Sequence, residues 1–214
     1  MASKNGNKQF FLGVLLGASL LGSGLVLAED NLKRDRGFYV GGGIGQSKFS
    51  NLDNICQNLL TQGGAAGSCD NKGFAYKAYA GYQFIRYFGV EVGYANFGKA
   101  QASVNSPALG NIDYKSQGVF VEGVVFVPLY NRWSALVKGG VLGWRTNLDI
   151  PSSLGLPSQS ATGWSGMWGG GFQYMITDAF GMRAEYEYYN SMGDSATTGA
   201  THVKVISIEG LLKF

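Results

Sequence analysis

The charged side chains in the middle of this 214-residue sequence stand at alternate positions within apolar, glycine-rich stretches. Those that share the polar side of the alternation are Lys77, Glu91, Glu122, Lys138, Arg183, Glu185, Glu187 and Glu209. If these groups face a common interior they must pair or find water, because burying an isolated charge costs several kcal/mol. They therefore allow two chemistries, which are a plug of ion pairs that fixes strand register and a gated, water-filled path for small ions. Of the two, we expect the plug.

A second pair of reactive groups is Cys56 and Cys69, the only cysteines, which fall in one linker between apolar segments. In an oxidising compartment, two cysteines in one loop most simply form a disulfide. The cross-link would stabilise the fold by about 3 kcal/mol in the chain-entropy model. No histidine or second cysteine pair stands nearby, so we expect no metal site and no cofactor. The closed loop is also a candidate recognition element, although nothing in its residues names a partner.

Composition and charge exclude several classes of protein. Glycine is abundant, at 34 residues, but with only 4 prolines and no Gly-X-Y period the chain is not collagen-like. Hydrophobic residues reach 45% and charged residues only 14%, which argues against a disordered tail. Without Lys4 and Lys8, which fall in the leader described next, the 17 basic residues become 15, against 14 acidic ones. No basic cluster remains that would indicate a nucleic-acid partner.

Residues 1–28 have the three parts of a cleaved secretory signal. Lys4 and Lys8 precede an apolar run over 10–27, and Val26 and Ala28 stand at −3 and −1 of a cleavage site before Glu29. The alternative is an uncleaved helix, since the run reaches the lower limit of about 17 residues for a membrane span. Four glycines within the run and the cleavage site that follows favour the signal peptide. No long apolar run follows, which leaves a soluble periplasmic protein or a β-barrel.

The remaining chain alternates apolar and polar residues with a period of two, which predicts strands. Eight segments, each long enough for a tilted membrane strand of about 9–11 residues, are 37–48, 73–84, 88–98, 114–127, 133–146, 162–175, 180–190 and 203–214. Long linkers (49–72, 99–113, 147–161 and 191–202) alternate with short ones. This alternation is typical of outer-membrane barrels, which join strands by tight periplasmic turns and longer outer loops. The sequence therefore predicts an all-β fold, an eight-stranded antiparallel up-and-down transmembrane β-barrel.

The two faces of the predicted strands indicate which one meets lipid. Aromatic residues gather near the short turns, as interfacial girdles do; they are Tyr82, Phe84, Phe88, Phe126, Phe172, Tyr174, Phe180 and Phe214. The charged face is rich in glycine, including Gly41, Gly43, Gly45 and Gly81. Small residues suit the crowded lumen of a narrow barrel better than a solvated surface. The apolar face is therefore expected to meet lipid and the charged face to fill the lumen.

Several short segments resemble the OmpA-type small outer-membrane β-barrel domain family. They are AGYQF (80–84) with FGVEVGY (88–94), FYVG (38–41), Gly139-Gly140 to Trp144-Arg145, and YMIT (174–177) leading to RAEY (183–186). The resemblance covers essentially the whole chain after the leader. It implies insertion by the outer-membrane assembly machinery, which in that family reads a C-terminal strand ending in an aromatic residue, here Phe214.

The same resemblance implies a charge network in the lumen, and the sequence departs from it in part. Glu91, Lys138 and Arg183 occupy matching positions, whereas Gln173 stands where a carboxylate is usual and Val124 where a lysine is usual. We expect Glu122 to take part instead. The family's best-known members continue into a periplasmic peptidoglycan-binding domain and this chain stops at the barrel, so we expect no tethering role.

His202 is the single histidine and stands near the outer end of the last predicted strand. Small barrels that edit lipid A use a histidine with serine or aspartate at this level, and Asp194, Ser195 and Ser207 are near in sequence. No spaced His-x-Ser pair occurs, since Val203 and Lys204 follow the histidine. We therefore expect a loop histidine and no catalytic residues, and keep a lipid-modifying enzyme as the third alternative.

Together these observations predict a signal peptide (1–28) and an outer-membrane β-barrel domain (29–214) of a Gram-negative bacterium. The expected function is non-enzymatic, in envelope structure and surface interaction, with a narrow gated pore as the alternative. The lumen residues expected to form ion pairs are Lys77, Glu91, Glu122, Lys138, Arg183, Glu185 and Glu209. Expected partners are outer-membrane lipid and lipopolysaccharide, the assembly machinery, and an extracellular ligand bound through small, polar loops around 103–111, 151–160 and 191–201. We expect a monomer.

Overall fold

The structure, a computed structural model, describes residues 36–50, 67–104, 111–149, 159–193 and 201–214. Its strands are β1 (Gly37–Phe49), β2 (Gly67–Asp70), β3 (Lys72–Ile85), β4 (Phe88–Val104), β5 (Asn111–Pro128), β6 (Trp133–Asp149), β7 (Gln159–Met175), β8 (Phe180–Met192) and β9 (Thr201–Lys213). No helix among these residues is long and apolar enough to cross a membrane.

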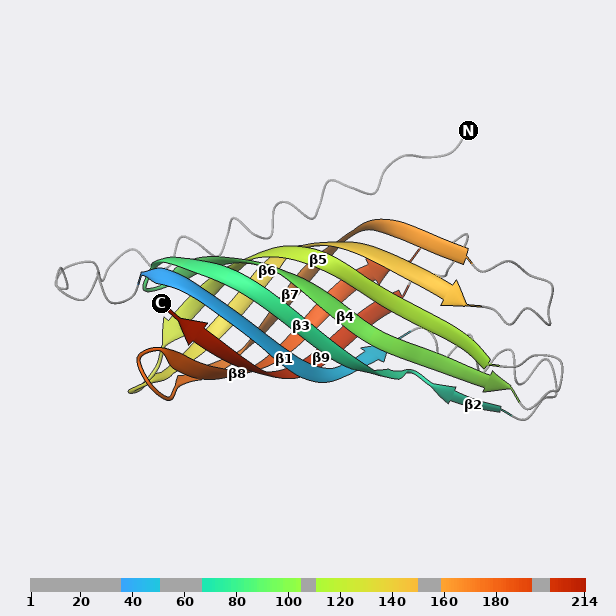
Figure 1. Cartoon of the computed structure of the whole chain (residues 1–214), viewed down its shortest axis with the longest axis horizontal. Helices are drawn as coiled ribbons and strands as arrows, with labels where there is room; N and C mark the ends of the chain where they lie inside the picture. The colour runs from blue at the N-terminus through green and yellow to red at the C-terminus, as the bar shows by residue number, and fades with distance from the viewer. Residues whose placement is uncertain (1–35, 51–66, 105–110, 150–158, 194–200) are drawn as a thin grey trace, which may run out of the picture. The chain divides into compact units, whose positions relative to one another are not determined.

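Eight of the strands form a closed antiparallel barrel (Figure 1). Each pairs with its neighbour in the chain, and β1 closes the ring by pairing with β9, as in Tyr39 opposite Lys213. All strands are tilted relative to the barrel's long axis, as closure of a sheet requires (Figure 1). The predicted fold class is therefore confirmed.

Two boundaries differ from the prediction. The linker expected over 49–72 contains β2, a four-residue strand that pairs with β4 outside the ring, for example Cys69 opposite Ala102. The strands β4 to β7 are 17 or 18 residues long, whereas β1, β8 and β9 have 13. The extra residues lie at the end with the long linkers, where polar residues on both faces hide the continuing strand from a search for apolar alternation.

Alternation along the strands separates the two faces, as predicted. Outward-facing side chains are mainly apolar and exposed, such as Val119 at 55%, Trp164 at 79% and Ile208 at 59%. Inward-facing positions include buried carboxylates and lysines. An apolar exterior around a charged interior is the arrangement expected of a barrel in lipid, where the strands satisfy every backbone group by closing on themselves.

The predicted position of one residue of the aromatic girdle, Phe126, is wrong. Phe126 is only 4% exposed and points into the lumen, with its ring 5.7 Å from the Arg183 guanidinium. It shares its face with the buried Glu122 and Val124, so strand alternation places it inside although its neighbours Val125 and Val127 are exposed. In this stretch both faces carry apolar residues, so hydrophobicity alone does not distinguish them.

Candidate functional site

The candidate site is the set of charged side chains inside the barrel. The seven residues predicted to form ion pairs, and Glu187 with them, all lie on the inward face and are at most 6% exposed. They come from β3, β4, β5, β6, β8 and β9, so strands far apart in the chain contribute to one cluster. The structure brings all seven predicted residues together.

Lys138 of β6 is the centre of the cluster. Its Nζ lies 2.8 Å from Glu91 Oε2, 3.1 Å from Glu122 Oε1 and 2.9 Å from Glu185 Oε1. The side chain is fully buried, and it joins β6 to β4, β5 and β8. Three carboxylates around one ammonium compensate the cost of burying that charge.

A second cation, Arg183 of β8, pairs with the same Glu91. Its Nη1 lies 2.6 Å from Glu91 Oε1, and its Nε donates to Gln173 Oε1 at 2.8 Å. The Tyr39 hydroxyl also donates to Glu91 Oε1, at 2.7 Å. Gln173, expected as a departure from the usual carboxylate, thus serves as a neutral acceptor for the guanidinium.

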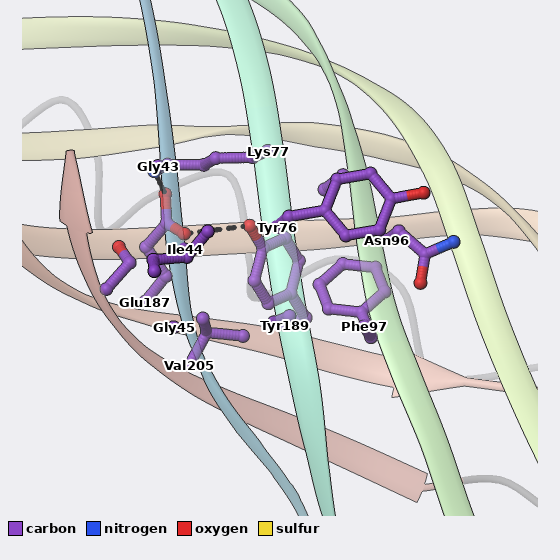
Figure 2. A pocket seen from close by; sticks show the side chains of 13 residues that line it. Gly43, Ile44, Gly45, Tyr76, Lys77, Asn96, Phe97, Glu187, Tyr189 and Val205 are labelled. Atoms are coloured by element: carbon purple, nitrogen blue, oxygen red, sulfur yellow. Dashed lines mark hydrogen bonds and ion pairs between the residues drawn. The ribbon is translucent and has the colours of Figure 1, made fainter. Parts of the chain in front are cut away.

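The third cation, Lys77 of β3, lies toward the end with the long linkers. Its Nζ is 2.5 Å from Glu185 Oε2, 2.8 Å from Glu187 Oε1 and 2.7 Å from Glu209 Oε1. Figure 2 shows Glu187 between Lys77 and Tyr189, whose hydroxyl donates to Glu187 Oε2 at 3.0 Å. A cavity of about 10 Å³ adjoins these side chains and is large enough for about one water molecule.

The cluster contains more acids than bases. Five carboxylates (Glu91, Glu122, Glu185, Glu187 and Glu209) face three cations, and all eight side chains are buried. Consistent with this excess, Glu122 Oε2 and Glu209 Oε2 have no hydrogen-bond partner among the described residues. The carboxylates are therefore not equivalent: Glu91 is fully engaged, whereas Glu122 is bound through one oxygen.

Two tyrosines that sequence reasoning did not single out belong to the site. The Tyr79 ring lies 5.3 Å from the Arg183 guanidinium and 5.4 Å from Lys138 Nζ, while the Tyr39 ring lies 5.2 Å from Arg183. Aromatic faces attract such cations by about 0.5–2 kcal/mol. Tyr79 shares strand parity with Lys77 on β3, and Tyr39 shares it with Gly41 and Gly43 on the glycine-rich face of β1. The alternation that identified the charged face therefore also carried the signal for both tyrosines.

Glycines make room for these rings. Gly41 is directly opposite Tyr79 in the β1–β3 ladder, and Gly81 is opposite Tyr39. A Cβ at Gly41 would lie within 2.8 Å of three atoms of the Tyr79 ring, and one at Gly81 would meet Tyr39 equally closely. The glycine-rich inward face thus reflects close packing between rings and backbone.

Above the charged cluster, toward the long linkers, the lumen is filled by an apolar layer. Its fully buried members are Phe49, Phe97, Phe120, Leu142, Met192 and Val203, with Tyr189 at the boundary. Phe97 and Tyr189 are in edge contact, with ring centroids 4.7 Å apart (Figure 2). The lumen therefore has two different barriers in series, one charged and one apolar.

The other residues singled out from the sequence lie away from this cluster. Cys56 is outside the described residues, and Cys69 lies in β2. The His202 ring stacks on Tyr188 at 5.6 Å, and its Nδ1 accepts a hydrogen bond from the Ser191 backbone N–H at 3.2 Å. Phe214 is 74% exposed on the outer face, and its backbone N–H donates to Phe38 O at 2.9 Å.

Comparison with known proteins gives one family. The family profile described as OmpA-like transmembrane domain matches residues 33–214. Outer membrane protein A of Shigella flexneri is 27% identical over 179 residues, which cover 83% of this chain and 48% of that protein. Outer membrane protein A of Escherichia coli O157:H7 is 27% identical over 180 residues, covering 83% and 47%. The chain spans about half the length of the curated relatives it matches.

Solved structures show the same fold. Neisserial surface protein A matches with a TM-score of 0.57 at 17% identity, covering 83% of this chain and 97% of that one. Ail of Yersinia pestis, solved in complex with the heparin analogue sucrose octasulfate, matches with a TM-score of 0.52 at 16% identity, covering 84% and 99%.

Proposed function

The chain belongs to the OmpA-like transmembrane domain family and is an outer-membrane barrel, and from this we propose that it is a closed, non-enzymatic barrel. Its role is to reinforce the envelope and to present loops at the cell surface. The observation that carries the proposal is the buried ion-pair cluster centred on Lys138, with three carboxylate contacts of 2.8 to 3.1 Å.

A bracing role is supported by which strands the pairs join. Arg183 and Glu91 lie on β8 and β4, and Lys77 and Glu185 on β3 and β8, which are not neighbours in the sheet. Ladder hydrogen bonds hold each strand only to the next one, whereas these pairs tie opposite walls together. Such contacts resist both flattening of the barrel and slippage of strand register.

Closure is supported by the packing of the lumen. Eight strands leave an interior that side chains fill, and here the apolar layer around Phe97, Phe120 and Leu142 lies in series with the charges. An ion entering from the outer end would have to pass fully buried aromatic and aliphatic side chains. Desolvating an ion there is unfavourable by far more than thermal energy.

Conductance of the purified full chain in planar bilayers tests this function. We expect no steady channels from the wild type, and none from Glu91→Ala as long as the barrel stays folded, because the apolar layer remains. Lys204→Gln, which removes an exposed outer charge, is the matched control. Steady wild-type channels whose conductance changes in Glu91→Ala or Arg183→Ala, but not in Lys204→Gln, would overturn the proposal.

One observation favours a second candidate, a narrow ion-conducting pore. Five buried carboxylates against three cations give the lumen an excess of negative charge, as a cation path would have. This alternative requires rearranged ion pairs and a displaced apolar layer. It is distinguished by its selectivity, since the channels would pass potassium in preference to chloride.

The non-enzymatic part of the proposal is supported by the surroundings of His202. Its Nδ1 accepts from the Ser191 backbone N–H, in the position that a carboxylate would occupy to orient a catalytic histidine. The test is mass spectrometry of lipid A from cells with and without the protein. We expect identical spectra, whereas an acyl chain gained or lost with wild type but not with His202→Ala would contradict the proposal.

We further propose that residues 1–28 are removed on export and that the loops face outward. The sequence pattern of the leader supports the first part. N-terminal sequencing of the outer-membrane form should begin at Glu29, and retention of Met1 would refute cleavage. A peptide tag inserted within 151–158 should be labelled on intact cells, while one inserted between Asn131 and Arg132 should not.

A further inference from the structure

A network of three hydrogen bonds joins four strands at the end with the long linkers. On β6, the Trp144 indole Nε1 donates to Ser165 Oγ of β7 at 2.8 Å. Ser165 Oγ in turn donates to the backbone O of Ser191 in β8 at 2.9 Å. The Ser191 N–H donates to Nδ1 of His202 in β9 at 3.2 Å. We call these four residues the outer network, in which side chains of neighbouring strands hold both backbone groups of Ser191.

Ser191 needs such support because its backbone is left-handed, with a φ of 43°. In this region the Cβ atom of an L-residue crowds the following carbonyl oxygen, so residues other than glycine, asparagine and aspartate rarely adopt it. A strained backbone conformation of this kind persists only where the surrounding structure fixes it. The hydrogen bonds to Ser165 and His202 supply that support here.

The conformation of Ser191 decides where the next side chain points. Tyr189 is opposite Val203 and Met192 is opposite Thr201, so β8 advances by three residues where β9 advances by two. The extra residue is a β-bulge, which re-aims the side chains that follow it. Simple alternation from Tyr189 would place Met192 on the outer face. The bulge at Ser191 instead turns Met192 into the lumen, where it is 0% exposed within the apolar layer.

The outer network requires a neutral His202. A neutral imidazole has one nitrogen that accepts a hydrogen bond, whereas both nitrogens of an imidazolium are donors. Because Nδ1 accepts from the Ser191 N–H, a proton on Nδ1 would set two N–H groups against each other. Imidazole is the side chain whose charge ordinarily changes between about pH 5 and 8. The contact with Ser191 is therefore present while the ring is neutral and is lost as the pH falls.

The bases and rings around His202 do not stabilise a protonated imidazole where it stands. On β9 the next residue of the same face is Lys204, and on β1 Lys48 is opposite Lys204. On β8 the Tyr188 ring stacks on His202, with ring centroids 5.6 Å apart. Two ammonium groups on this face repel a positive ring, so the imidazolium gains by moving away from its present position.

The acidic side chains that the structure describes lie elsewhere. The five described glutamates all point into the lumen, and Asp178 lies in the short linker between β7 and β8, at the opposite end. The aspartates after β1 whose side chains fall outside the described ones are Asp53, Asp70, Asp113, Asp149 and Asp194. Replacing His202 alone separates the titration of the imidazole from the titration of all these carboxyl groups.

We propose that His202 is a pH-sensitive switch for the apolar barrier of the lumen. The neutral ring holds Ser191 in the left-handed conformation that keeps Met192 inside, and protonation of the ring releases both residues. The inference goes beyond the closed barrel proposed above, because it names a condition under which one of the two barriers loosens. It concerns the position of Met192 and is independent of whether the lumen conducts ions.

The test is oxidation of the purified full chain by hydrogen peroxide in nonionic detergent, at about pH 7.5 and about pH 5. Peroxide converts a methionine thioether to the sulfoxide, and peptide mass spectrometry gives the rate at each methionine. A buried methionine reacts through local opening, so its rate follows the population of the open form. Met182, 44% exposed, gives the chemical rate at each pH, and Met167, 4% exposed in the regular β7–β8 ladder, reports any general loosening.

Two variants separate the hydrogen bond from the ring. His202→Asn offers a side-chain oxygen as acceptor for the Ser191 N–H and does not titrate. His202→Phe keeps a ring against Tyr188 but has neither an acceptor nor a titrating group. Thermal unfolding checks that the wild type and both variants are folded at each pH.

We expect acid to speed oxidation of Met192 in the wild type by roughly three- to tenfold relative to Met182, which is the ordinary contribution of one hydrogen bond. Met167 should not change. His202→Asn should be slow at both pH values, and His202→Phe should be fast at both. Equal rates of Met192 oxidation at the two pH values, an acid response that persists in His202→Asn, slow oxidation in folded His202→Phe, or an equal acceleration at Met167 would each overturn the switch. Conductance, which tests the closed barrel, is a separate measurement, so failure of one proposal is distinguishable from failure of the other.

Discussion

Arg183 and Glu91 form an ion pair across the full width of the barrel, with Nη1 and Oε1 2.6 Å apart. The two residues are 92 positions apart in the sequence, and their strands β8 and β4 stand four places apart in the ring of eight. The pair can form only once the ring has closed, so it reports the completed barrel.

Lys138→Met should be strongly destabilising. The substitution leaves Glu91, Glu122 and Glu185 without the ammonium that lies within 3.1 Å of each. Breaking a buried pair by removing one partner costs about 3–5 kcal/mol. Urea unfolding in lipid vesicles measures the loss, and Lys204→Met, on the outer face, should change the free energy of unfolding by less than about 1 kcal/mol. Equal effects of the two substitutions would show that the cluster does not brace the barrel.

Glu122→Gln and Glu91→Gln should have opposite consequences although the chemical change is the same. Glu122 uses one oxygen for Lys138 and leaves Oε2 without a partner among the described residues. An amide there keeps the one contact and removes an excess negative charge, so stability should stay within about 1 kcal/mol of wild type or rise.

Glu91, by contrast, accepts hydrogen bonds from Tyr39, Lys138 and Arg183. Its replacement should cost about 3–5 kcal/mol, because an amide NH₂ would face a cation or a hydroxyl donor. Urea unfolding of both variants measures the free energy of unfolding. A larger loss of stability in Glu122→Gln than in Glu91→Gln would contradict the assignment of the excess negative charge to Glu122.

Gly41→Ala should lower the stability of the barrel, whereas Gly166→Ala should not. A Cβ at Gly41 meets the Tyr79 ring at 2.4 Å, whereas nothing lies within 4 Å of one at Gly166. Overpacking of this kind costs about 1–3 kcal/mol, while alanine in an open strand position is preferred over glycine by about 0.5–1 kcal/mol. The readout is the midpoint of urea unfolding. If Gly41→Ala matched Gly166→Ala, the ring of Tyr79 would have to be free to move aside.

Cys56 and Cys69 should be joined in the exported protein. Without reductant neither thiol should react with an alkylating reagent, and the intact mass should be lower than the reduced mass by two hydrogens. Cys56→Ser/Cys69→Ser should lower the free energy of unfolding by up to about 3 kcal/mol. The reduced wild type is the control and should behave like the double variant, and alkylation of both thiols without reductant would disprove the pairing.

Phe214→Ser should impair assembly in cells more than stability. The ring is 74% exposed on the lipid face, close to Phe38, which is 66% exposed and whose carbonyl accepts from the Phe214 N–H. Phe38→Ser is the matched control, since it removes a similar apolar contact with lipid. Both variants should refold similarly into vesicles, but only Phe214→Ser should reduce the assembled barrel in the outer membrane. An equal loss in cells would remove Phe214 from the assembly signal.

Strand positions and faces were predictable because a membrane barrel repeats one simple constraint. Neighbouring side chains meet lipid and lumen in turn, so Glu209 between Ile208 and Gly210, or Arg183 between Met182 and Ala184, could be placed inside from the sequence. The set of lumen charges followed from the same parity. The pairing among them did not, since it depends on strand tilt and on the distance across the closed ring.

The apolar layer and β2 were not predictable for a different reason. Around Phe120 both faces of β5 are apolar, because Val119 and Val121 meet lipid while Phe120 packs in the lumen. The contrast on which the face assignment depends is absent there, and Phe126 was misplaced for the same reason. The strand β2 is four residues long and pairs only with the extension of β4, so no alternation marks it.

The unequal strand lengths make one side of the barrel different from the other. The strands β4 to β7 run four or five residues further than β1, β8 and β9 at the end with the long linkers, which is about 13–16 Å along the strand. The described strands therefore end at two levels, with β4 to β7 reaching further than β1, β8 and β9. Rotating the barrel about its own axis therefore changes which strands face a given neighbour. A neighbouring molecule in the membrane therefore meets longer strands on the side of β4 to β7 than on the side of β1, β8 and β9, so its contacts depend on which side it approaches.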